Sequence, residues 1–315
     1  MKLGMVFPGQ GSQSVGMLMG YGGLPEVDAV RAEAASALGD GFLEILDLGP
    51  AEQLNLTVNT QPAMLTAAIA AYRAWCALGG PAPRFVAGHS LGEYSALVAA
   101  GSLALRDALP LVRFRAQSMQ EAVPEGQGAM AAILGLDDDA ARAACAEAER
   151  QGNAGEAVQA VNFNAPGQVV IAGSKEAVAR AIEACRARGA KRAMPLPVSA
   201  PFHSSLMQPA AVKLGSYMEK LVFAEPKIPV INNVDVREET NPVRIRDALV
   251  RQAASPVRWA ETIRCMAAQG VTHVVECGPG KVLAGLVKRI DPRLQGIAAA
   301  DRASLEQALA AIKGG

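Results

Sequence analysis

The amino-acid sequence predicts an α/β protein with a parallel sheet at its core and a smaller unit inserted into it. Short apolar runs alternate with helical stretches along most of the chain, which is the order typical of a parallel sheet. One of these runs passes through a glycine-bracketed turn directly into a helix. Between residues 128 and 198 the order changes to β-α-β-β-α-β, which is that of a ferredoxin-like unit. We therefore expect a large domain of residues 1–127 and 199–315 around a small domain of residues 128–198.

The composition indicates a globular protein with a sizeable core and disfavours some classes of partner. Half of the 315 residues are hydrophobic, 19% are charged, and 30 basic residues balance 30 acidic ones. This balance gives no reason to expect nucleic acid binding. The apolar stretches are far shorter than a membrane-spanning helix, and the N-terminal run is too short for a signal peptide. We therefore expect a cytoplasmic protein that binds neither nucleic acid nor membrane.

The five cysteines predict neither a disulfide framework nor a zinc site. They are odd in number, scattered and without a C-x-x-C pair, which is typical of reduced thiols in a cytosolic protein. They are Cys76, Cys145, Cys185, Cys265 and Cys277.

The first apolar run, Leu3–Phe7, is expected to form a buried strand that leads into a glycine-rich loop. The loop Pro8–Gln13 lacks the Gly-Lys-Ser/Thr of a phosphate-binding loop and the glycine spacing of a dinucleotide site. Because it follows the first strand, it lies at the carboxyl edge of the sheet, where open α/β proteins keep their sites. It either supplies backbone N–H groups to an oxyanion or is an ordinary strand-to-helix turn.

The following segment is predicted to be helical up to a second strand. Residues 26–56 show weak helical patterns. A long helix, Pro62–Leu78, is capped by Asn59–Gln61, carries proline in its first turn and ends at two glycines. The strand Phe85–Ala87 comes next. Two more helices are expected at Glu93–Ala100 and Leu105–Ala122.

The turn between that strand and helix, Gly88–Gly92, fits the pattern G-x-S-x-G. In a strand–turn–helix context this pattern marks a nucleophilic serine on a sharp turn. The turn needs small residues on both sides of Ser90, because the backbone approaches its neighbours closely. The serine then lies at a helix N-terminus, where free N–H groups favour a developing oxyanion. The alternative is a glycine-bracketed turn in which Ser90 only caps the helix.

The helix that follows carries one arginine on its apolar face. Arg115 lies three residues after Val112 and four before Met119, whereas Arg113 shares a polar face. An arginine turned toward the core needs an anion. Periodicity alone favours a structural partner such as a nearby glutamate. The alternative is a substrate carboxylate, which a planar guanidinium binds with two hydrogen bonds.

The inserted unit accounts for about seventy residues and ends with a basic cluster. The expected strands are Ala129–Leu134, Ala157–Asn162, Gln168–Ala172 and Lys191–Leu196, and the expected helices are Asp137–Arg150 and Lys175–Arg188. The basic residues at the second helix and its exit are Arg186, Arg188, Lys191 and Arg192. Such a cluster is either a solvated face or a surface for an acidic protein.

Elimination among the three histidines selects a candidate general base. His89 precedes the serine in the turn and is expected to point away from it. His273 lies in an apolar strand and is expected to be a hydrogen-bonded core residue. His203 lies in the loop Ser199–Ser205, where the inserted unit rejoins the large domain, and clefts favour such junctions. We therefore expect His203 to be the base.

The remainder of the chain returns to alternating strands and helices. The expected strands are Pro229–Asn232, Val271–Glu276 and Gly296–Ala300, and the expected helices start near Met207 and Ser255 or span Arg244–Ala254, Val282–Arg289 and Ser304–Ile312. The sequence Gly278–Gly280 is predicted to form a tight turn, with an anion-binding loop as the alternative.

Five motifs occur together in a fixed order. They are Gly9–Gln13, Gly88–Glu93, Arg115 with Met119 and Gln120, Asn162–Gln168, and Phe202–Ser204. Their combination resembles the malonyl-CoA:acyl carrier protein transacylases of bacterial fatty acid synthesis, and the resemblance covers nearly the whole chain. It implies an α/β-hydrolase-like large domain with an inserted ferredoxin-like small domain, which is the layout expected above.

The resemblance also implies roles for individual residues. It makes Ser90 the nucleophile, His203 the base and the backbone N–H groups of Gln10 and Leu91 the oxyanion hole. It places the malonyl carboxylate on Arg115. The remaining implied positions are the backbone carbonyl of Gln252, which orients the histidine, and the cleft residues Gln61, Asn162 and Phe202. From sequence alone, Asp235 and Asp247 stay open as acid partners of the histidine.

The function so implied is transfer of a malonyl group from malonyl-CoA to the phosphopantetheine thiol of holo-acyl carrier protein. The reaction passes through a malonyl-serine ester and needs no metal and no tightly bound cofactor. We expect a monomer. The alternatives are a trans-acting malonyl acyltransferase of polyketide synthesis, a thioesterase or esterase on the same scaffold, and a catalytically silent docking module.

Overall fold

The central sheet of the computed structural model, which describes residues 2–198 and 200–314, has five parallel strands. Their order is β7-β2-β1-β8-β9, so the N-terminal strand lies in the middle of the sheet. The strands are β1 (Leu3–Phe7), β2 (Phe85–Gly88), β7 (Val230–Ile231), β8 (His273–Cys277) and β9 (Gln295–Ala299). The predicted parallel core is confirmed. The expected domain limits at residues 1, 199 and 315 lie outside the described residues.

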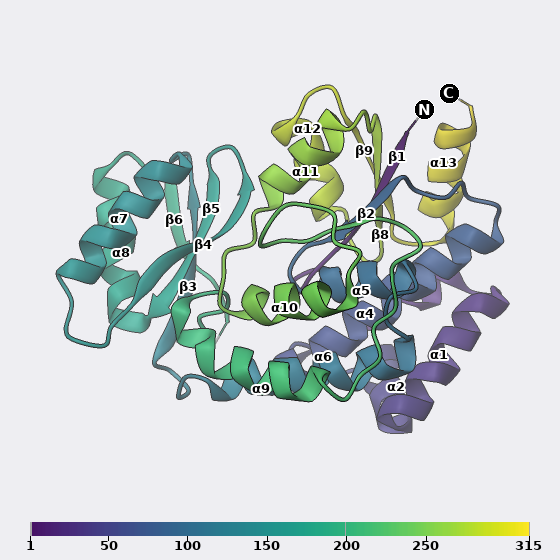
Figure 1. The fold of residues 1–315 in the computed structure, drawn as a ribbon, viewed down its shortest axis with the longest axis horizontal. Coiled ribbons are helices and arrows are strands. Elements are labelled where there is room, and N and C mark those ends of the chain that lie inside the picture. The colour runs from purple at the N-terminus through teal and green to yellow at the C-terminus, as the bar shows by residue number, and fades with distance from the viewer. Residues whose placement is uncertain (1, 199, 315) are drawn as a thin grey trace.

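Alternating side chains of the central strands build two separate cores, one on each face of the sheet. Met5 and Phe7 of β1 and Val275 of β8 belong to the first core, while Val6 and Val274 belong to the second. Helices of the first core are α1 (Pro25–Leu38), α4 (Thr57–Ala77), α5 (Gly92–Ala99), α6 (Leu105–Glu121) and α13 (Arg302–Lys313). The second core is covered by α11 (Trp259–Ala268) and α12 (Val282–Ile290), which lie together in Figure 1. The sheet is therefore buried on both faces, as its near-continuous apolar strands require.

Further helices complete this part of the chain around the first core. They are η1 (Met19–Tyr21), α2 (Asp40–Leu48), α3 (Ala51–Leu54), η2 (Ser205–Met207), α9 (Gln208–Met218) and α10 (Pro242–Ala253). The weak helical patterns of residues 26–56 thus correspond to α1, α2 and α3. Within residues 2–198 and 200–314, no helix has the length and apolarity needed to cross a membrane.

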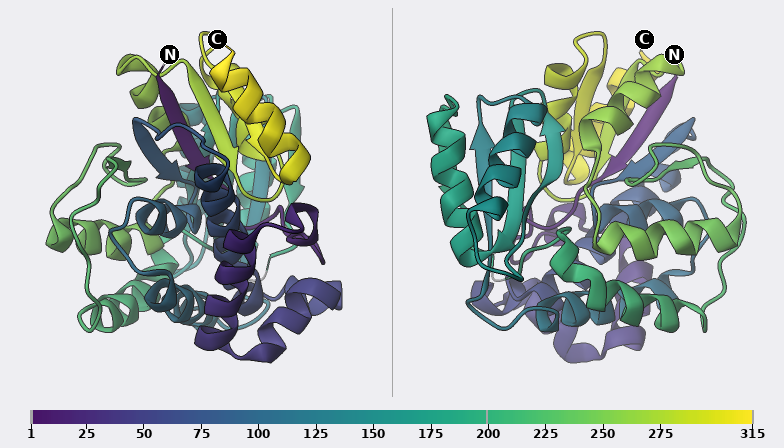
Figure 2. Two further views of the ribbon diagram at one scale, coloured as in Figure 1. Left: turned by 90° about the vertical axis from the view of Figure 1, so that its right-hand side faces the viewer. Right: turned by 60° about the vertical axis from the view of Figure 1, so that its left-hand side comes forward.

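The inserted unit forms its own antiparallel sheet in the order β4-β5-β3-β6. Its strands are β3 (Gly128–Leu134), β4 (Val158–Ala165), β5 (Gln168–Ser174) and β6 (Arg192–Pro195), and its helices are α7 (Asp138–Arg150) and α8 (Lys175–Ala187). Numbered within the unit, the strand order is 2-3-1-4, as expected for the ferredoxin-like arrangement. Both helices lie on the side away from the central sheet (Figures 1 and 2).

One edge of the small sheet is joined to the large domain by backbone hydrogen bonds. The amide of Val257 donates to Val161 of β4 over 2.8 Å, and the amide of Phe163 donates to Val257 over 3.0 Å. Ala165 at the end of β4 packs in the second core of the large domain. The segment that leads into α11 therefore continues the small sheet and fixes where the small domain lies.

Two local predictions differ from the structure. The long helix starts at Thr57 instead of Pro62, so the proline lies inside α4. Proline removes one backbone donor, but the helix is kept because it is buried along most of its length, and Thr66 Oγ1 donates to the carbonyl of Pro62. His273 is half-buried at the start of β8, with its Nδ1 2.9 Å from Thr272 Oγ1, so the prediction of a core histidine was wrong.

Candidate active site

The glycine-bracketed turn joins β2 to α5 and holds Ser90 in a left-handed backbone conformation, with a φ of 53°. The two flanking glycines are needed because of close contacts. A Cβ on Gly88 would lie 1.8 Å from the carbonyl carbon of Gly92, and one on Gly92 would lie 2.1 Å from the oxygen of Phe7. The backbone amide of Ser90 donates to Asn233 Oδ1 over 2.9 Å. The serine is thus held at the carboxyl end of β2, as the pattern predicts.

His203 lies against the serine from the opposite side of the cleft. Its Nε2 is 2.7 Å from Ser90 Oγ, and its Nδ1 is 2.9 Å from the backbone oxygen of Gln252. A carbonyl oxygen only accepts, so Nδ1 carries the proton and Nε2 accepts from the serine. Burial, followed by the charge of Arg115, lowers the pKa of His203 to about 3. The imidazole is therefore neutral at neutral pH, with Nε2 unprotonated and directed at the serine hydroxyl.

The carboxylates that sequence left open as partners of the histidine are engaged elsewhere. Asp235 and Asp247 both accept hydrogen bonds from Arg251, at 2.8 Å and 2.7 Å for the shortest contacts. The histidine is instead oriented by a neutral carbonyl, at the position implied by the family resemblance. His203 itself has a φ of 66°, so its backbone is in the left-handed region as well.

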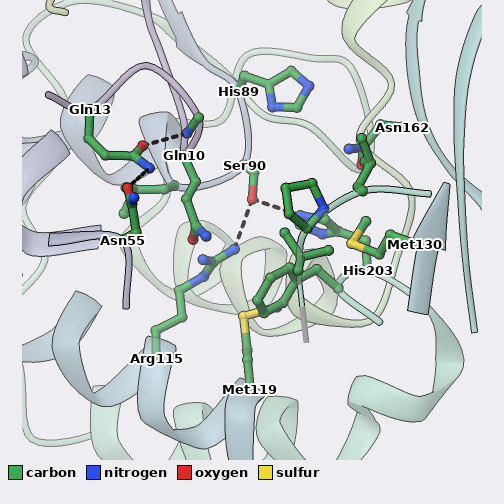
Figure 3. Close-up of a pocket in the computed structure, with 16 residues that line it drawn as sticks. Gln10, Gln13, Asn55, His89, Ser90, Arg115, Met119, Met130, Asn162 and His203 are labelled. Atoms are coloured by element: carbon green, nitrogen blue, oxygen red, sulfur yellow. Dashed lines mark hydrogen bonds between the residues drawn. The ribbon is translucent and has the colours of Figure 1, made fainter. Parts of the chain in front are cut away.

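Arg115 extends from α6 into the site and is 2% exposed. Its Nη2 donates to Ser90 Oγ over 3.1 Å (Figure 3). Its Nη1 donates to Gln61 Oε1 over 2.8 Å, and Nη2 also donates to Gln252 Oε1 over 3.0 Å. None of the ion pairs among the described residues includes Arg115, so the structural glutamate that periodicity favoured does not contact it. Burial lowers the pKa of this guanidinium against the opposing effect of nearby Tyr94 and Glu93, and its three hydrogen-bond partners are neutral side chains. The site therefore holds a buried cation next to the serine.

Two residues that line the same cavity as Ser90 have backbone amides without an acceptor in the described chain. Among the described residues, neither the amide of Leu91 nor that of Gln10 donates a hydrogen bond. The loop that carries Gln10 is held in place by side chains. The amide of Gly11 donates to Gln13 Oε1 over 2.7 Å, and Thr57 Oγ1 donates to Gln10 Oε1 over 2.8 Å. The loop after β1 is thus held in place by these two hydrogen bonds, while the backbone amide of Gln10 keeps no acceptor.

A cavity of about 550 Å³ connects these groups with the small domain. Besides the residues above it is lined by Gln13, Asn55, His89, Met119, Met130, Asn162, Leu196, Pro197, Val198 and Phe202. A second hollow of about 540 Å³ shares some of this lining and continues along Leu56–Val58. The two together form a cleft between the domains that leads from the surface to Ser90.

The structure brings together most of the residues that the sequence singled out. Asn162 and Phe202 line the cavity, and Gln61 reaches the site through its bond to Arg115. His89 turns away from the serine in Figure 3 and lies 2.8 Å from Asn164 Oδ1. The turn Gly278–Gly280 packs against the loop after β1, with a Cβ on Gly280 2.8 Å from Ser12. This favours the tight turn.

Three polar residues around Ser90 were not recognised as a group from sequence. Glu93, Asn233 and the side chain of Gln252 are buried and hydrogen-bonded to one another beneath the serine. Their separation along the chain, up to 159 residues, leaves no local signal. In the described part of the chain, no three His, Cys, Asp or Glu side chains are grouped so that they could hold a metal ion.

Comparisons with known proteins agree with this geometry. Residues 5–300 match the family model described as acyl transferase domain. A malonyl CoA-acyl carrier protein transacylase of Escherichia coli is 56% identical over 309 residues, covering 98% of this chain and 99% of that protein. The crystal structure of an acyl-carrier-protein S-malonyltransferase of Burkholderia pseudomallei is 60% identical with a TM-score of 0.95, covering 98% of this chain and 99% of that one. A malonyl-transacylase in complex with a type II PKS acyl-carrier protein is 52% identical with a TM-score of 0.95 and covers 98% and 99%.

Proposed function

Because the chain belongs to the acyl transferase family, among the malonyl CoA-acyl carrier protein transacylases, we propose that Ser90 carries the malonyl group between malonyl-CoA and holo-acyl carrier protein. The observation that carries this assignment is the position of Ser90 Oγ. It lies 2.7 Å from a neutral imidazole nitrogen and 3.1 Å from a buried guanidinium. A nucleophile, its base and a site for a carboxylate are thus within one hydrogen bond of each other.

In the first half-reaction, Ser90 Oγ attacks the thioester carbonyl carbon of malonyl-CoA while its proton moves to His203 Nε2. The resulting oxyanion is held by the free amides of Gln10 and Leu91. The intermediate collapses by breaking the carbon–sulfur bond, and the imidazolium returns its proton to the departing CoA thiolate. The Nδ1–H bond to Gln252 keeps the ring in one tautomer throughout.

In the second half-reaction, the phosphopantetheine thiol of the carrier protein takes the place of CoA. His203 Nε2 accepts the thiol proton, the sulfur attacks the ester carbonyl carbon, and the bond to Ser90 Oγ breaks with return of the proton to the serine. The same amides hold the second oxyanion. Because CoA leaves before the carrier protein reacts with the malonyl-serine ester, the kinetics are of the ping-pong type.

The malonyl carboxylate is proposed to bind the Nη groups of Arg115, which now have only neutral partners. Gln61 holds one Nη from the opposite side, so the guanidinium keeps its position when a ligand binds. Phe202 and Leu91 lie in the cavity lining, where a branched acyl group would meet them. This arrangement selects malonyl over acetyl by charge and over methylmalonyl by shape.

We further propose that the enzyme acts as a cytoplasmic monomer without a tightly bound cofactor or metal, and that residues 128–198 form the small domain. Support for the monomer comes from the site itself, since the nucleophile, base, guanidinium and oxyanion amides all belong to one chain. The proposal that no metal or cofactor is needed rests on the mechanism above, in which His203 carries out each proton transfer. The small domain has its own sheet and its own hydrophobic core.

The assignment is tested by the intact mass of the protein after brief treatment with malonyl-CoA. We expect one malonyl adduct, which holo-carrier protein removes and water removes slowly. Ser90→Ala should form no adduct, because the nucleophile is gone while the fold keeps its shape. Full labelling of Ser90→Ala would exclude this serine, and an adduct that water clears as fast as the carrier protein would indicate a thioesterase.

A second candidate is malonyl loading of a polyketide carrier protein. It is favoured by the complex of a 52% identical malonyl-transacylase with a type II PKS acyl-carrier protein. The two functions share every residue discussed above and differ only in the partner. Initial rates with fatty-acid-type and polyketide-type holo-carrier proteins, measured with one saturating concentration of malonyl-CoA, separate them.

A further inference from the structure

Glu93 is the last residue of the motif around Ser90. It lies beneath the serine but has no part in the mechanism above. Its carboxyl is 2% exposed, and burial raises its pKa to about 7 against the opposing effect of its hydrogen bonds. Oε2 accepts from the amide of Asn233 and from Gln252 Nε2, both over 2.9 Å. Oε2 can accept both bonds whether or not the other oxygen carries a proton, so this role does not depend on the charge of Glu93.

The second acceptor of the Gln252 side chain fixes its orientation further. Gln252 Nε2 also donates to the backbone oxygen of Ser90 over 3.0 Å. Asn233 Oδ1 lies 3.4 Å from Nε2 as a third acceptor, so all three groups that face Nε2 accept and the NH₂ end of the amide must point toward them. The oxygen end must then point to the other side, where Arg115 Nη2 donates to it over 3.0 Å. A flipped amide would place NH₂ against a donor-only guanidinium.

The same carboxyl holds the serine turn through its other partner. Asn233 accepts from the amide of Ser90 and donates through Nδ2 to the oxygen of Gly88 over 2.8 Å. Gln252 and Asn233 are 0% exposed. In a dry site each of these bonds is strong, and an unmet donor is costly. Glu93 therefore connects the guanidinium side of the site to the nucleophile side.

We propose that Glu93 is a positioning residue for acyl-group selection, which holds Arg115 over Ser90 by fixing the side-chain amide of Gln252. The inference rests on the proposed role of Arg115 in binding the malonyl carboxylate. It separates the two functions of Gln252: its backbone oxygen orients His203, and its side chain orients Arg115. Loss of the Glu93 acceptor leaves the amide held by the weaker set of Ser90 and Asn233 oxygens, so the guanidinium is less firmly fixed while every group that touches substrate is kept.

The test is the ratio of kcat/KM for malonyl-CoA to that for acetyl-CoA. Glu93→Met keeps the length of the side chain and removes the acceptor, and we expect the ratio to fall about tenfold or more, as for residues coupled in one hydrogen-bond network. Glu93→Gln keeps an acceptor for both donors and should hold the ratio within about threefold of wild type. Glu93→Asp, one methylene shorter, replaces the methionine variant if that protein does not fold.

Glu276 offers a matched control, since it is a buried glutamate on β8 whose carboxyl binds the amide of Ala284 and none of the site residues described. Glu276→Met should lower thermal stability and leave the acyl ratio unchanged. A ratio that stays at the wild-type value in Glu93→Met, or that falls equally in both methionine variants, would overturn the inference.

A double-mutant cycle and Arg115→Ala complete the experiment. Gln252→Met keeps the backbone oxygen for His203 and should lower the ratio like Glu93→Met, and the double variant should be no worse than either, because Glu93 acts through Gln252. Additive losses would contradict that dependence. Arg115→Ala checks the premise separately: an unchanged ratio there means that the carboxylate binds elsewhere, whereas a loss there with none in Glu93→Met refutes only the positioning role.

Discussion

At the residue scale, we expect Arg115 to determine which acyl group the enzyme accepts. A malonyl carboxylate gives its buried charge a partner, whereas acetyl does not. Removing one partner of a buried charge pair costs about 3–5 kcal/mol, which is about two to four orders of magnitude in rate. We expect Arg115→Ala to lose malonyl transfer by that amount and to gain acetyl transfer in absolute terms, as measured by kcat/KM for malonyl-, acetyl- and methylmalonyl-CoA.

Arg115→Lys is the control that keeps the positive charge but loses the planar shape of the guanidinium. Arg115→Lys should restore malonyl transfer only in part, because an ammonium cannot make the two-pronged contact of a guanidinium. An Arg115→Ala enzyme that keeps its malonyl-to-acetyl ratio would place the carboxylate elsewhere, and Arg113 on the neighbouring face of α6 would be examined next.

The pH dependence of acylation follows from the lowered pKa of His203. Because that pKa is about 3, compared with an ordinary 6.5, the base stays unprotonated throughout the mildly acidic range. We expect kcat/KM for malonyl-CoA to stay nearly level from pH 8 down to pH 5. Glu93, unlike His203, has a pKa of about 7 and does titrate in this range, so the profile is repeated in Glu93→Gln. A tenfold decline per pH unit below 6.5 in both proteins would contradict the prediction.

The lowered pKa of His203 makes the stability of the fold depend on pH in the range where the rate of acylation does not. Below pH 6.5, His203 binds a proton in the unfolded chain but stays unprotonated in the folded chain. The free energy of unfolding therefore falls as the pH falls. This group alone contributes a slope of at most about 1.4 kcal/mol per pH unit. His203→Ala should remove that slope in urea unfolding and slow acylation by several orders of magnitude. His273→Ala, on β8, should do neither.

Sequence singled out the two residues that we propose to react, but it could not show the buried polar group that supports them. Ser90 stands in a pattern with a known backbone shape, and His203 is what remains after His89 and His273 are set aside. Glu93 ends the motif around Ser90, but nothing in the motif shows its bond to Asn233, which lies 140 positions farther along the chain. The role of the Gln252 carbonyl came only from the family resemblance, because a backbone oxygen leaves no mark in the sequence.

At the level of elements, the turn between β2 and α5 tolerates no Cβ at its glycines. Gly92 begins α5, and a Cβ there would lie 2.1 Å from the backbone oxygen of Phe7, which is held in the sheet. We expect Gly92→Ala to lose at least about 3 kcal/mol of stability, since rigid backbone cannot give way. Thermal unfolding and malonyl labelling would both report the loss.

Gly285 in α12 provides the matched substitution. It is a helical glycine with no atom within 4 Å of an added Cβ. Gly285→Ala should be neutral or stabilise by about 0.5–1 kcal/mol, because alanine has the better helix propensity. Equal effects of the two alanines would show that helix propensity, and not the close approach of β1, governs the turn.

Strands were easier to predict than helix starts. The apolar runs of β1, β2 and β8 are short, bounded by turn residues and buried on both faces, so their pattern is unambiguous. The start of α4 was placed five residues late, because proline was assigned to the first turn while the buried remainder of the helix extends past it. The order of the strands in the sheet depends on contacts between distant segments and was not predicted.

At the scale of the whole molecule, the small domain presents the surface on which we expect a carrier protein to dock. Arg186 and Arg188 of the basic cluster are paired with Glu183 and Glu147 within the domain. Lys191 and Arg192 are exposed and have no ion pair among the described residues. The strand that they begin continues into Leu196–Val198 of the cleft lining, about 15 Å farther at ~3.3 Å per residue.

Charge reversal distinguishes the free cations from the paired ones. Lys191→Glu with Arg192→Glu should raise the KM for holo-carrier protein by about tenfold at low salt, less at high salt, and leave the KM for malonyl-CoA unchanged. Arg188→Glu should have a smaller effect on docking, because that charge is already paired. Equal changes of both KM values in the first variant would indicate general damage.

The central place of β1 has a consequence for synthesis of the chain on the ribosome. β1 emerges first, yet its neighbours are β2, about eighty residues later, and β8, about 270 residues later. The four strands of the small domain form their ladders with each other, within residues 128–195, and the later segment at Val257 adds only a short bridge to β4. Local pairings close before distant ones, so we expect the inserted domain to fold while the N-terminal strand still waits for half of its partners. An apolar strand whose one edge stays unpaired for that time is a site at which we expect chaperones to bind.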